Sequence, residues 1–360
     1  MQIDILPVGD EIHRYKKSIV VPFRGRRKVL STCPLNGGYR EDLTAVFNND
    51  GNPGAGIACT LKAPTYEEHM MLIARELGLD AGVTAGMSTA ASMENVAIHT
   101  ETFEELAVTA VITGGIEVNG GRVGDPASWY EKSGEAVSVK QGTINIMLFI
   151  NTDLTAGAMT RAIVTCTEAK TAAIQELLAP SRYSMGLATG SGTDGTILVC
   201  NAQSNVKLTD AGKHSKLGEL IGRAVKTAVK EALKKQSGLT PQRQHNMLRR
   251  MDRFGITEDT IWSLFCEKHT AVQRAVFEDR LWKLAADGDV VVYASLYAHL
   301  LDQLMWGMIS KEEAMRAGTA VIGMIKKEHA VCPETPATEE ETLHDMIERF
   351  KHAICETIKV

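Results

Sequence analysis

Residues 140–201 decide the fold of this chain, and they read KQGTINIMLFINTDLT, AGAMTRAIVTCTEAKTAAIQELLAPS and RYSMGLATGSGTDGTILVCN. An apolar run from Ile144 to Ile150 directly follows Gly142-Thr143 and has the length of a buried strand. Apolar residues then recur at spacings of three and four over 155–179, which predicts an amphipathic helix with Thr155 as its N-cap. A hydroxyl group set just before a buried strand, beside polar loops, is more typical of an active site than of a plain core.

A glycine-rich loop at 186–195 follows the helix and leads into a second predicted strand at 196–200. Within this loop, Gly190-Ser-Gly-Thr-Asp-Gly195 matches the G-x-G-x-x-G pattern of dinucleotide-binding proteins. That pattern requires a strand before it and a helix after it, whereas here a strand follows, so we reject nucleotide binding. Asp194 is a candidate catalytic residue, and an Asp that only forms the turn explains the same position equally well.

Composition narrows the class of protein. The 360 residues suffice for one large core or two domains. A formal net charge of -5 and an aromatic fraction of 5% give no reason to expect a nucleic-acid partner. The first residues contain no uninterrupted apolar segment, so we expect neither a signal peptide nor a membrane span. Seven scattered cysteines are typical of reduced thiols, which favours a cytoplasmic protein.

The segment before residue 140 is predicted to contain mostly strands and polar loops. Two apolar runs, 18–23 and 29–33, flank a basic turn and are predicted to form a hairpin. A long glycine-dense loop follows Thr113-Gly114-Gly115, and long loops in compact domains are often functional. Further strands are predicted at 43–47, 96–99 and 107–112, and a helix with Thr65 as N-cap at 65–79.

Glycine becomes sparse after a helix that is predicted to begin at Ser215, and we place a domain boundary near residue 238. The predicted fold class is α/β in residues 1–238, followed by an all-α unit in residues 239–360. Helical patterns in that unit cover 241–253, 257–270, 272–286, 290–308, 311–328 and 340–358, with Pro241 at a first helical turn.

Several polar residues are candidates for amide or ester chemistry. The Thr143 hydroxyl can act as a nucleophile if a base activates it. One such base is its own α-amine, once the peptide bond between Gly142 and Thr143 has been cleaved. The alternative is that Thr143 is only a β-branched residue that begins a strand. Thr113 and Gly114 can supply donors for an oxyanion hole, or simply form a tight turn. Glu168 and His214 are candidate acid–base partners, and His214 can equally be a capping residue.

Three cysteine–histidine pairs lie in the predicted helical unit. They are Cys266 and His269, His329 and Cys332, and His352 and Cys355, each pair three residues apart and on one face if helical. Such pairs can bind a transition metal, but none shows the spacing of a zinc finger, and we assign no metal site.

The sequence closely resembles the adenosylcobinamide amidohydrolases over about residues 10–238. The blocks that carry the resemblance occur in order and are LSTCPLNGGYRED, TGGIEVNGGRVGDPA, GTINIMLFIN, RAIVTCTEAKTAAIQELLAPS, GLATGSGTDG and LTDAGKHSKLGELIG. The resemblance implies a corrinoid-salvage enzyme. It would hydrolyse the amide between the corrin propionyl side chain and aminopropanol, and release adenosylcobyric acid.

A more distant similarity links GTINIMLFINTD, the helix after it and the next loop to the self-cleaving ornithine acetyltransferases. The similarity implies that residues 1–238 form a layered α/β sandwich like the core of those proteins. It also implies that Thr143 is the new amino-terminal nucleophile and that Thr113 and Gly114 are oxyanion donors. If the bond before Thr143 stays intact, His214, Glu168 or Asp194 would have to serve as the base.

The corrinoid is expected to lie across the glycine-rich loops, where small residues let a flat macrocycle approach the backbone. The expected substrate-binding residues are Asn36, Gly37, Gly38, Gly115, Asn119, Gly190 and Gly192. Cobalt would arrive with the substrate, so no cofactor is expected, and a homodimer is possible. The alternatives are an acyltransferase with the same acyl-enzyme chemistry and a non-catalytic corrinoid-binding or sensing protein. The helical residues 239–360 fall outside the resemblance.

Overall fold

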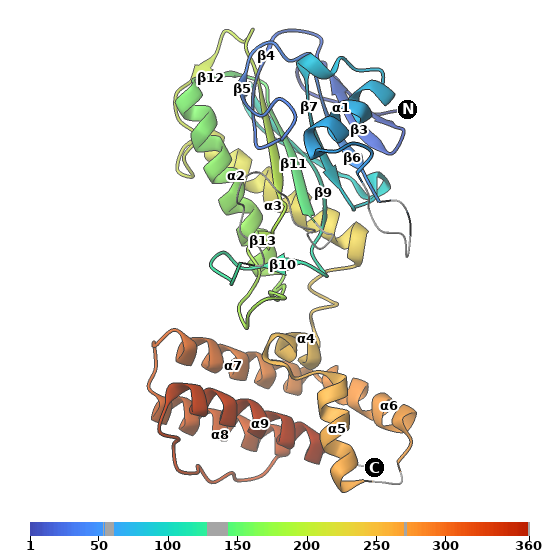
Figure 1. Cartoon of the computed structure of the whole chain (residues 1–360). Helices are drawn as coiled ribbons and strands as arrows, with labels where there is room; N and C mark the ends of the chain where they lie inside the picture. Colours follow the sequence, from blue (N-terminus) through green and yellow to red (C-terminus); the bar gives the residue numbers. More distant parts are fainter. Residues whose placement is uncertain (53, 55–60, 128–142, 270–271, 359–360) are drawn as a thin grey trace. The chain divides into compact units, whose positions relative to one another are not determined.

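The computed structural model describes residues 1–52, 54, 61–127, 143–269 and 272–358 (Figure 1). The chain divides into two compact units: Met1–Tyr183 with Leu187–Thr240, and Ser184–Gly186 with Pro241–Val360. Among the described residues the first unit is α/β, and the helices and connecting loops of the second include no strand, as predicted from the sequence. No helix in the described ranges is both long and apolar enough to cross a membrane.

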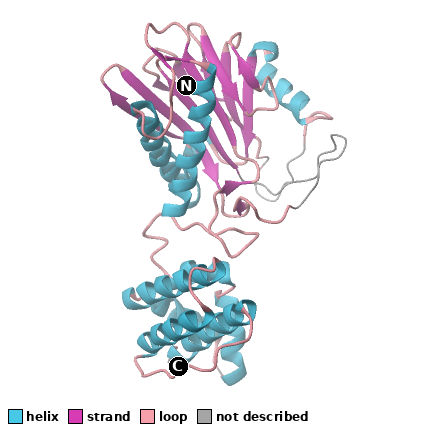
Figure 2. Ribbon diagram, turned by 90° about the vertical axis from the view of Figure 1, so that its left-hand side faces the viewer, coloured by secondary structure: helices cyan, strands magenta, loops and turns pink. Residues whose placement is uncertain are grey.

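Two β-sheets pack face to face in the α/β unit (Figure 2). The five-stranded sheet has the order β1 (Gln2–Ile5), β2 (Glu11–Tyr15), β3 (Ser18–Pro22), β6 (Ala45–Asp50) and β7 (Thr84–Thr89). The six-stranded sheet has the order β5 (Gly38–Arg40), β4 (Arg27–Ser31), β14 (Gly195–Asn201), β11 (Thr143–Ile150), β9 (Leu106–Gly115) and β8 (Ala97–Phe103). Short ladders join β10 (Gly120–Gly121) to β13 (Gly190–Ser191), and β12 (Asp153–Leu154) to β15 (Lys207–Leu208).

Helices cover the outer face of each sheet, which gives four layers (Figure 2). Helices α2 (Ala156–Glu176) and α3 (Lys216–Ser237) pack on the six-stranded sheet, and α1 (Tyr66–Glu76) packs on the five-stranded sheet. Each large apolar side chain that is fully buried between such layers contributes about 1.5–3 kcal/mol of stability. The strands and helices therefore hold together through three apolar layers.

β11 is the central strand of the six-stranded sheet, antiparallel to β9 and parallel to β14. All eight of its residues are buried, so its side chains alternate between two different apolar layers. Ile144, Ile146 and Leu148 pack against the helices, whereas Met147 and Phe149 pack between the sheets. This alternation points Thr143 and Asn145 into the layer between the sheets.

Local signals in the sequence located the helices of this unit correctly. Thr65, Thr155 and Ser215 are the N-caps of α1, α2 and α3, and each side-chain oxygen accepts a hydrogen bond from a main-chain N–H of the first turn. Gly238 ends α3 in the left-handed conformation with φ 69°, where glycine avoids the strain that a side chain would cause.

The predicted hairpin over 18–33 is wrong. β3 pairs with β2 and β6 in one sheet, whereas β4 pairs with β14 and β5 in the other. The basic turn therefore carries the chain from one sheet to the other. The strand predicted at 43–47 is shifted and becomes β6, because Asn48, Asn49 and Asp50 continue the ladder with β7 instead of ending it.

The second unit is a bundle with its own apolar core. Its helices are α4 (Met247–Met251), α5 (Glu258–Lys268), α6 (Arg274–Ala285), α7 (Gly288–Met305), α8 (Lys311–Lys326) and α9 (Glu339–Thr357). The prediction of a helix that starts at Pro241 is wrong, because residues 241–246 form turns and Asn246 caps α4. A nearly buried ion pair between Arg253 and Asp302, with N–O distances of 2.5 and 2.7 Å, joins the turn after α4 to α7.

We expect Arg27→Met to destabilise the α/β unit strongly. The Arg27 guanidinium donates two 2.9 Å hydrogen bonds to the Asp10 carboxylate, and the two residues are 4% and 0% exposed. Removing one partner of a buried ion pair leaves an uncompensated charge and costs about 3–5 kcal/mol. Chemical denaturation followed by circular dichroism measures the change in the free energy of unfolding.

The matched control is Lys62→Met, which breaks a 2.9 Å ion pair with Glu76 in the same unit. Both of those side chains are more than half exposed, and an exposed pair contributes about 0–1 kcal/mol. Equal losses of stability in the two variants would contradict a special role for the buried pair.

Candidate active site

A row of hydrogen-bonded polar side chains lies at one end of the layer between the two sheets. Asn145 on β11 donates a 2.8 Å hydrogen bond from Nδ2 to Oδ1 of Asn48 on β6. Asn48 in turn donates a 2.8 Å bond to the hydroxyl of Thr113 on β9. Thr143 completes the row, because its hydroxyl lies 3.3 Å from Oδ1 of Asn145. All four side chains are buried, so these bonds satisfy groups that would otherwise be costly to desolvate.

The strand register brings Thr143 and the Thr113–Gly115 segment together. Thr143 is paired with Gly115, Ile144 with Gly114, and Asn145 with Thr113. The amino end of β11 and the carboxyl end of β9 therefore lie side by side, as the hypothesis of a nucleophile next to oxyanion donors requires. A side chain at Gly114 would press against Ile144, with a Cβ only 3.2 Å from it.

The Thr143 hydroxyl donates a 2.6 Å hydrogen bond to the main-chain carbonyl of Thr193. Thr143 is 3% exposed in this conformation. An amide carbonyl accepts hydrogen bonds but does not take up a proton near neutral pH, so Thr193 holds the hydroxyl without activating it.

The neighbouring Asp194 carboxylate receives four hydrogen-bond donors. Oδ1 accepts a 2.9 Å bond from the Ile144 main-chain N–H and a 2.7 Å bond from the Ser191 hydroxyl. Oδ2 accepts a 3.0 Å bond from the Ser191 main-chain N–H and a salt bridge from Lys170. Both Asp194 oxygens are therefore occupied by other donors, and the Thr143 hydroxyl is directed at the Thr193 carbonyl, so this carboxylate is not placed to act as its general base.

A cavity of about 580 Å³ lies beside this carboxylate, within the usual size range of small-molecule sites. It is bounded by α2, by the loop after β9 and by the glycine-rich loop before β14. Its lining residues include Asn119, Arg122, Asp125, Lys170, Tyr183, Gly190, Gly192 and Asp194. Asn119, Gly190 and Gly192, predicted to bind substrate, therefore share the wall of one cavity. Thr143 does not line this cavity, but its hydroxyl is bonded to Thr193, the residue before Asp194.

Glu168 and His214 are not brought to Thr143, which corrects their assignment as its acid–base partners. Glu168 forms a 2.9 Å ion pair with Lys213 on the other side of α2, and this hydrogen bond lowers the pKa of its carboxyl. His214 is exposed just before α3, where Lys216 lies over the ring of Phe103. Phe103 pairs with Leu106, the first residue of β9, whereas Gly115 is the last residue of that strand. The two ends of a strand of this length are about 30 Å apart, so His214 lies far from Thr143.

The loop with Asn36, Gly37 and Gly38 begins at the same end of the six-stranded sheet as Thr143. At the start of β14, the Thr32 main-chain N–H donates to the Thr196 carbonyl and the Thr196 N–H donates to the Thr32 hydroxyl, both at 3.0 Å. Asn36 itself is used within the fold. Its Nδ2 donates to the carbonyls of Ala81 and Thr84, and its Oδ1 accepts from Arg40. Gly37 has no room for a side chain, since a Cβ would lie 2.1 Å from the Cys33 carbonyl oxygen. Contact of this loop with a substrate stays a prediction.

Three buried cysteines of this unit are poor nucleophiles. Burial raises the pKa of Cys33 and Cys166 to about 12 and that of Cys200 to about 11. A thiol must lose its proton to attack, so these groups stay inert near neutral pH. This favours a hydroxyl group as the nucleophile.

Sequence reasoning missed Lys170, Asn48 and Asn145. Lys170 could have been found from the sequence, because it is a charged residue at a position where the spacing of α2 predicts a buried apolar side chain. Asn145 is the single polar residue inside an otherwise apolar strand, two positions after Thr143. Asn48 gave no local signal, because its role depends on the pairing of distant strands.

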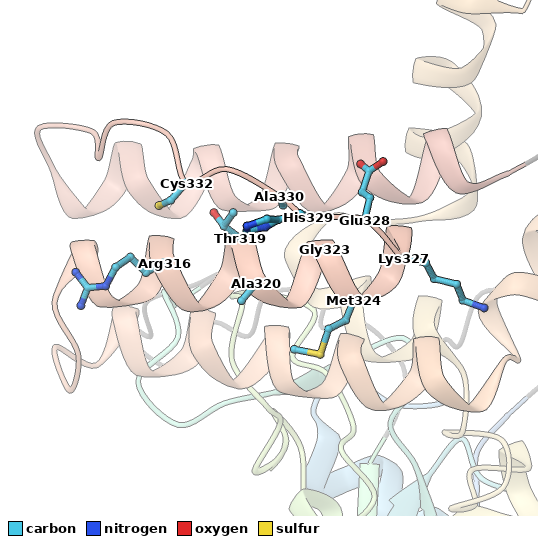
Figure 3. A pocket seen from close by; sticks show the side chains of 10 residues that line it. All are labelled: Arg316, Thr319, Ala320, Gly323, Met324, Lys327, Glu328, His329, Ala330 and Cys332. Atoms are coloured by element: carbon cyan, nitrogen blue, oxygen red, sulfur yellow. The ribbon is translucent and has the colours of Figure 1, made fainter.

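The helical unit contains a separate and larger hollow of about 750 Å³ between α8 and residues 327–332 (Figure 3). His329 and Cys332 line it together with Thr319 and Met324. The described part of the chain contains no cluster of three or more His, Cys, Asp or Glu side chains suited to a metal. Despite its size, this hollow is not the candidate active site, because it contains none of the hydroxyl and carboxylate groups described above.

The other two cysteine–histidine pairs do not form open sites. The ring of His269 stacks on Phe265 with centroids 4.3 Å apart. Cys355 is buried, whereas His352, on the same helix, is exposed. These side chains have ordinary positions in a helical bundle.

A threonine hydroxyl at the start of a central strand, next to main-chain amides of the adjoining strand, is typical of enzymes that cleave amides through an acyl intermediate. Comparison with known proteins agrees with this class: a model of the adenosylcobinamide amidohydrolase family matches residues 4–241. The chain belongs to the adenosylcobinamide amidohydrolase family, which supports amidohydrolase activity on a cobinamide substrate.

Two relatives each match more than half of this chain. An uncharacterised protein of Methanocaldococcus jannaschii is 38% identical over 231 residues, which are 61% of this chain and 87% of that protein. The adenosylcobinamide amidohydrolase of Methanosarcina mazei is 28% identical over 207 residues, which are 55% of this chain and 86% of that protein. The family match ends at residue 241, so most of the helical unit lies outside it.

We expect Gly190→Ala to reduce amidohydrolase activity about tenfold or more, since small displacements at a reacting centre have large effects. The added Cβ would lie 2.2 Å from Oδ2 of Asp194 and 2.8 Å from Nζ of Lys170, so the ion pair must move. Steady-state hydrolysis of adenosylcobinamide by the purified variant measures the effect.

Gly222→Ala on α3 is the control, because nothing lies within 4 Å of its added Cβ and alanine favours a helix. Activity of Gly190→Ala equal to that of Gly222→Ala would show that the position of the ion pair is unimportant.

Proposed function

We propose that the α/β unit hydrolyses the amide that joins the corrin propionyl side chain to 1-aminopropan-2-ol in adenosylcobinamide, giving adenosylcobyric acid. The family supplies the substrate class. The observation that carries the choice of nucleophile is the pairing of Thr143 with the Thr113–Gly115 end of β9. It provides a hydroxyl group and potential oxyanion donors on adjacent strands.

The base in this proposal is the α-amine of Thr143. Cleavage of the peptide bond between Gly142 and Thr143 would free it; Gly142 lies outside the described ranges. Two observations favour an amine over a side chain. Asp194 already receives four donors, and Glu168 and His214 lie elsewhere. An amine on the same residue needs no other partner within reach, as in other amino-terminal threonine nucleophiles.

The reaction proceeds by acyl transfer in two halves. The Thr143 hydroxyl oxygen attacks the amide carbon while its proton passes to the α-amine. The carbonyl oxygen becomes negatively charged, and the Thr113 hydroxyl and the Gly114 N–H stabilise it. The carbon–nitrogen bond then breaks, and the leaving amine takes the proton. Water attacks the resulting ester, which releases the carboxylate and restores the hydroxyl.

The Thr113 hydroxyl is suited to this role because it accepts a bond from Asn48 and can still donate its own hydrogen. Asn145 orders the row by donating to both Asn48 and the Ser88 carbonyl, the latter at 3.0 Å. These buried bonds hold donors in place before the substrate arrives, which lowers the reorganisation needed in the transition state.

We expect Thr143→Ala to abolish release of 1-aminopropan-2-ol, and Thr143→Ser to retain measurable hydrolysis, because serine keeps the hydroxyl. Mass spectrometry of the corrinoid products after incubation with adenosylcobinamide measures both. Corrinoid binding by Thr143→Ala serves as the folding control. Full hydrolysis by Thr143→Ala would rule out this nucleophile.

Self-cleavage predicts two chains of about 15 and 24 kDa in place of one of 39.1 kDa. Intact-mass spectrometry of the purified protein resolves them, and Thr143→Ala should remain a single chain. A fully active wild-type protein that stays uncut would exclude the α-amine as base.

The same experiments separate hydrolysis from acyl transfer. Isotopically labelled 1-aminopropan-2-ol added to the reaction would be incorporated into the corrinoid if amine competes with water for the acyl group. In this proposal cobalt enters with the substrate, so dialysis of the protein against EDTA should leave the rate unchanged. A loss of rate that added metal restores would contradict that part of the proposal.

A further inference from the structure

Lys170 is a lysine on the buried face of α2. It is 9% exposed, and its neighbours one turn away on the same face are Cys166, Ala173 and Ile174, all buried. Removing an ammonium group from water costs several kcal/mol unless an opposite charge compensates it. A lysine in this place therefore needs a partner, and its position in an otherwise apolar stripe calls for a reason.

The compensating charge is Asp194, and the pair is nearly enclosed, with 11% and 14% of the two side chains exposed. Lys170 contacts Oδ2, while the Ile144 N–H and the Ser191 hydroxyl contact Oδ1. Through this one carboxylate, α2 is connected to the start of β11 and to the glycine-rich loop.

The connection continues to the hydroxyl of Thr143. Asp194 is covalently joined to Thr193, whose carbonyl accepts the 2.6 Å bond from Thr143 Oγ1. The same carboxylate fixes the amide of Ile144, the residue next to Thr143. The two main-chain groups that flank the hydroxyl are thus both set by the position of one ion pair.

We propose that Lys170 is a positioning residue for Thr143. Its ammonium holds the Asp194 carboxylate against the amino end of β11, and so fixes the hydroxyl relative to Thr113 and Gly114. The inference rests on the proposed function, in which Thr143 is the nucleophile. The competing explanation is that Lys170 only neutralises a buried charge and supports the fold.

Other charged or titratable groups border the cavity on which Lys170 opens. Arg122 and Asp125 come from the loop after β9, and Tyr183 comes from the segment after α2. Asp125 accepts hydrogen bonds from the Arg122 main-chain N–H and the Ser181 hydroxyl, whereas Lys170 and the Asp194 carboxylate contact each other directly. The positioning role therefore belongs to the pair and not to the cavity wall in general.

The chain offers a matched control on the same helix. Glu168, two residues before Lys170, forms a 2.9 Å ion pair with Lys213. These side chains are 47% and 57% exposed, and the pair borders a different hollow, together with Gly218 and Arg223. Lys213→Met therefore removes a lysine–carboxylate pair at α2 that has no connection to Thr143.

The test compares kcat and KM for adenosylcobinamide in full-length Lys170→Met, Lys170→Arg and Lys213→Met. We expect Lys170→Met to lower kcat about 100-fold with KM changed by less than about threefold, because a displacement of about 1 Å at the reacting group costs this much. Lys170→Arg restores a cation, so its kcat should be at least tenfold higher than that of Lys170→Met. Lys213→Met should match the wild-type protein.

The double variant Lys170→Met/Asp194→Asn keeps the test decisive if Lys170→Met fails to fold, since it leaves no unpaired buried charge. We expect the double variant to fold and to keep a low kcat, because a neutral amide oxygen holds the Ile144 and Ser191 donors less strongly. Wild-type kcat in the double variant would overturn the proposal, and so would a change confined to KM in Lys170→Met.

Thr143→Ala measured in parallel distinguishes the two levels of the argument. Full hydrolysis by Thr143→Ala means that the proposed function has failed. An inactive Thr143→Ala together with wild-type kcat in Lys170→Met means that the positioning role alone has failed.

Discussion

The burial of β11 between two neighbouring strands and two apolar layers is the constraint on which the rest of the site depends. Its pairing with β9 and β14 fixes its register along its whole length. Because side chains alternate, that register decides that Thr143 and Asn145 face the second sheet and Ile144 faces the helices. A shift by one residue would place isoleucine beside Asn48 and bury Asn145 in the apolar layer between the sheet and the helices α2 and α3. The apolar contacts of 146–150 therefore hold the polar end of the strand in place.

Elements with local signals were predicted well from the sequence. The strand at 143–150 and the helices capped by Thr65, Thr155 and Ser215 are confirmed, because apolar spacing and capping act within a few residues. The hairpin over 18–33 failed for the complementary reason. Two neighbouring apolar strands with a short turn satisfy every local rule. Instead of pairing with each other, β3 pairs with nearby β2 and distant β6, and β4 pairs with nearby β5 and distant β14. Pairing with distant strands decided which sheet each one joined.

The same limit explains what was predicted of the site. Thr143, Thr113, Gly114 and Asp194 were proposed from glycine-rich segments and from a family resemblance, and the fold brings them together. Asn48 could not be proposed, since its value comes from facing Thr113 and Asn145 across the gap between two sheets. Glu168 and His214 were proposed because they lie at the edge of a glycine-rich loop or on a helix facing one. Helix geometry turns Glu168 away from Thr143, and a whole strand length separates His214 from it.

An ion pair next to the proposed nucleophile suggests that the carboxylate of the pair is the general base, but the contacts of Asp194 argue against that interpretation. A general base must have a free lone pair directed at the proton it removes. The Asp194 oxygens are occupied by Lys170, Ile144 and Ser191, and the hydroxyl of Thr143 is directed at a carbonyl instead. Charge at Asp194 therefore serves to fix the main chain on both sides of the hydroxyl. In the proposed mechanism the proton instead passes to the α-amine of Thr143, at the amino end of the same strand.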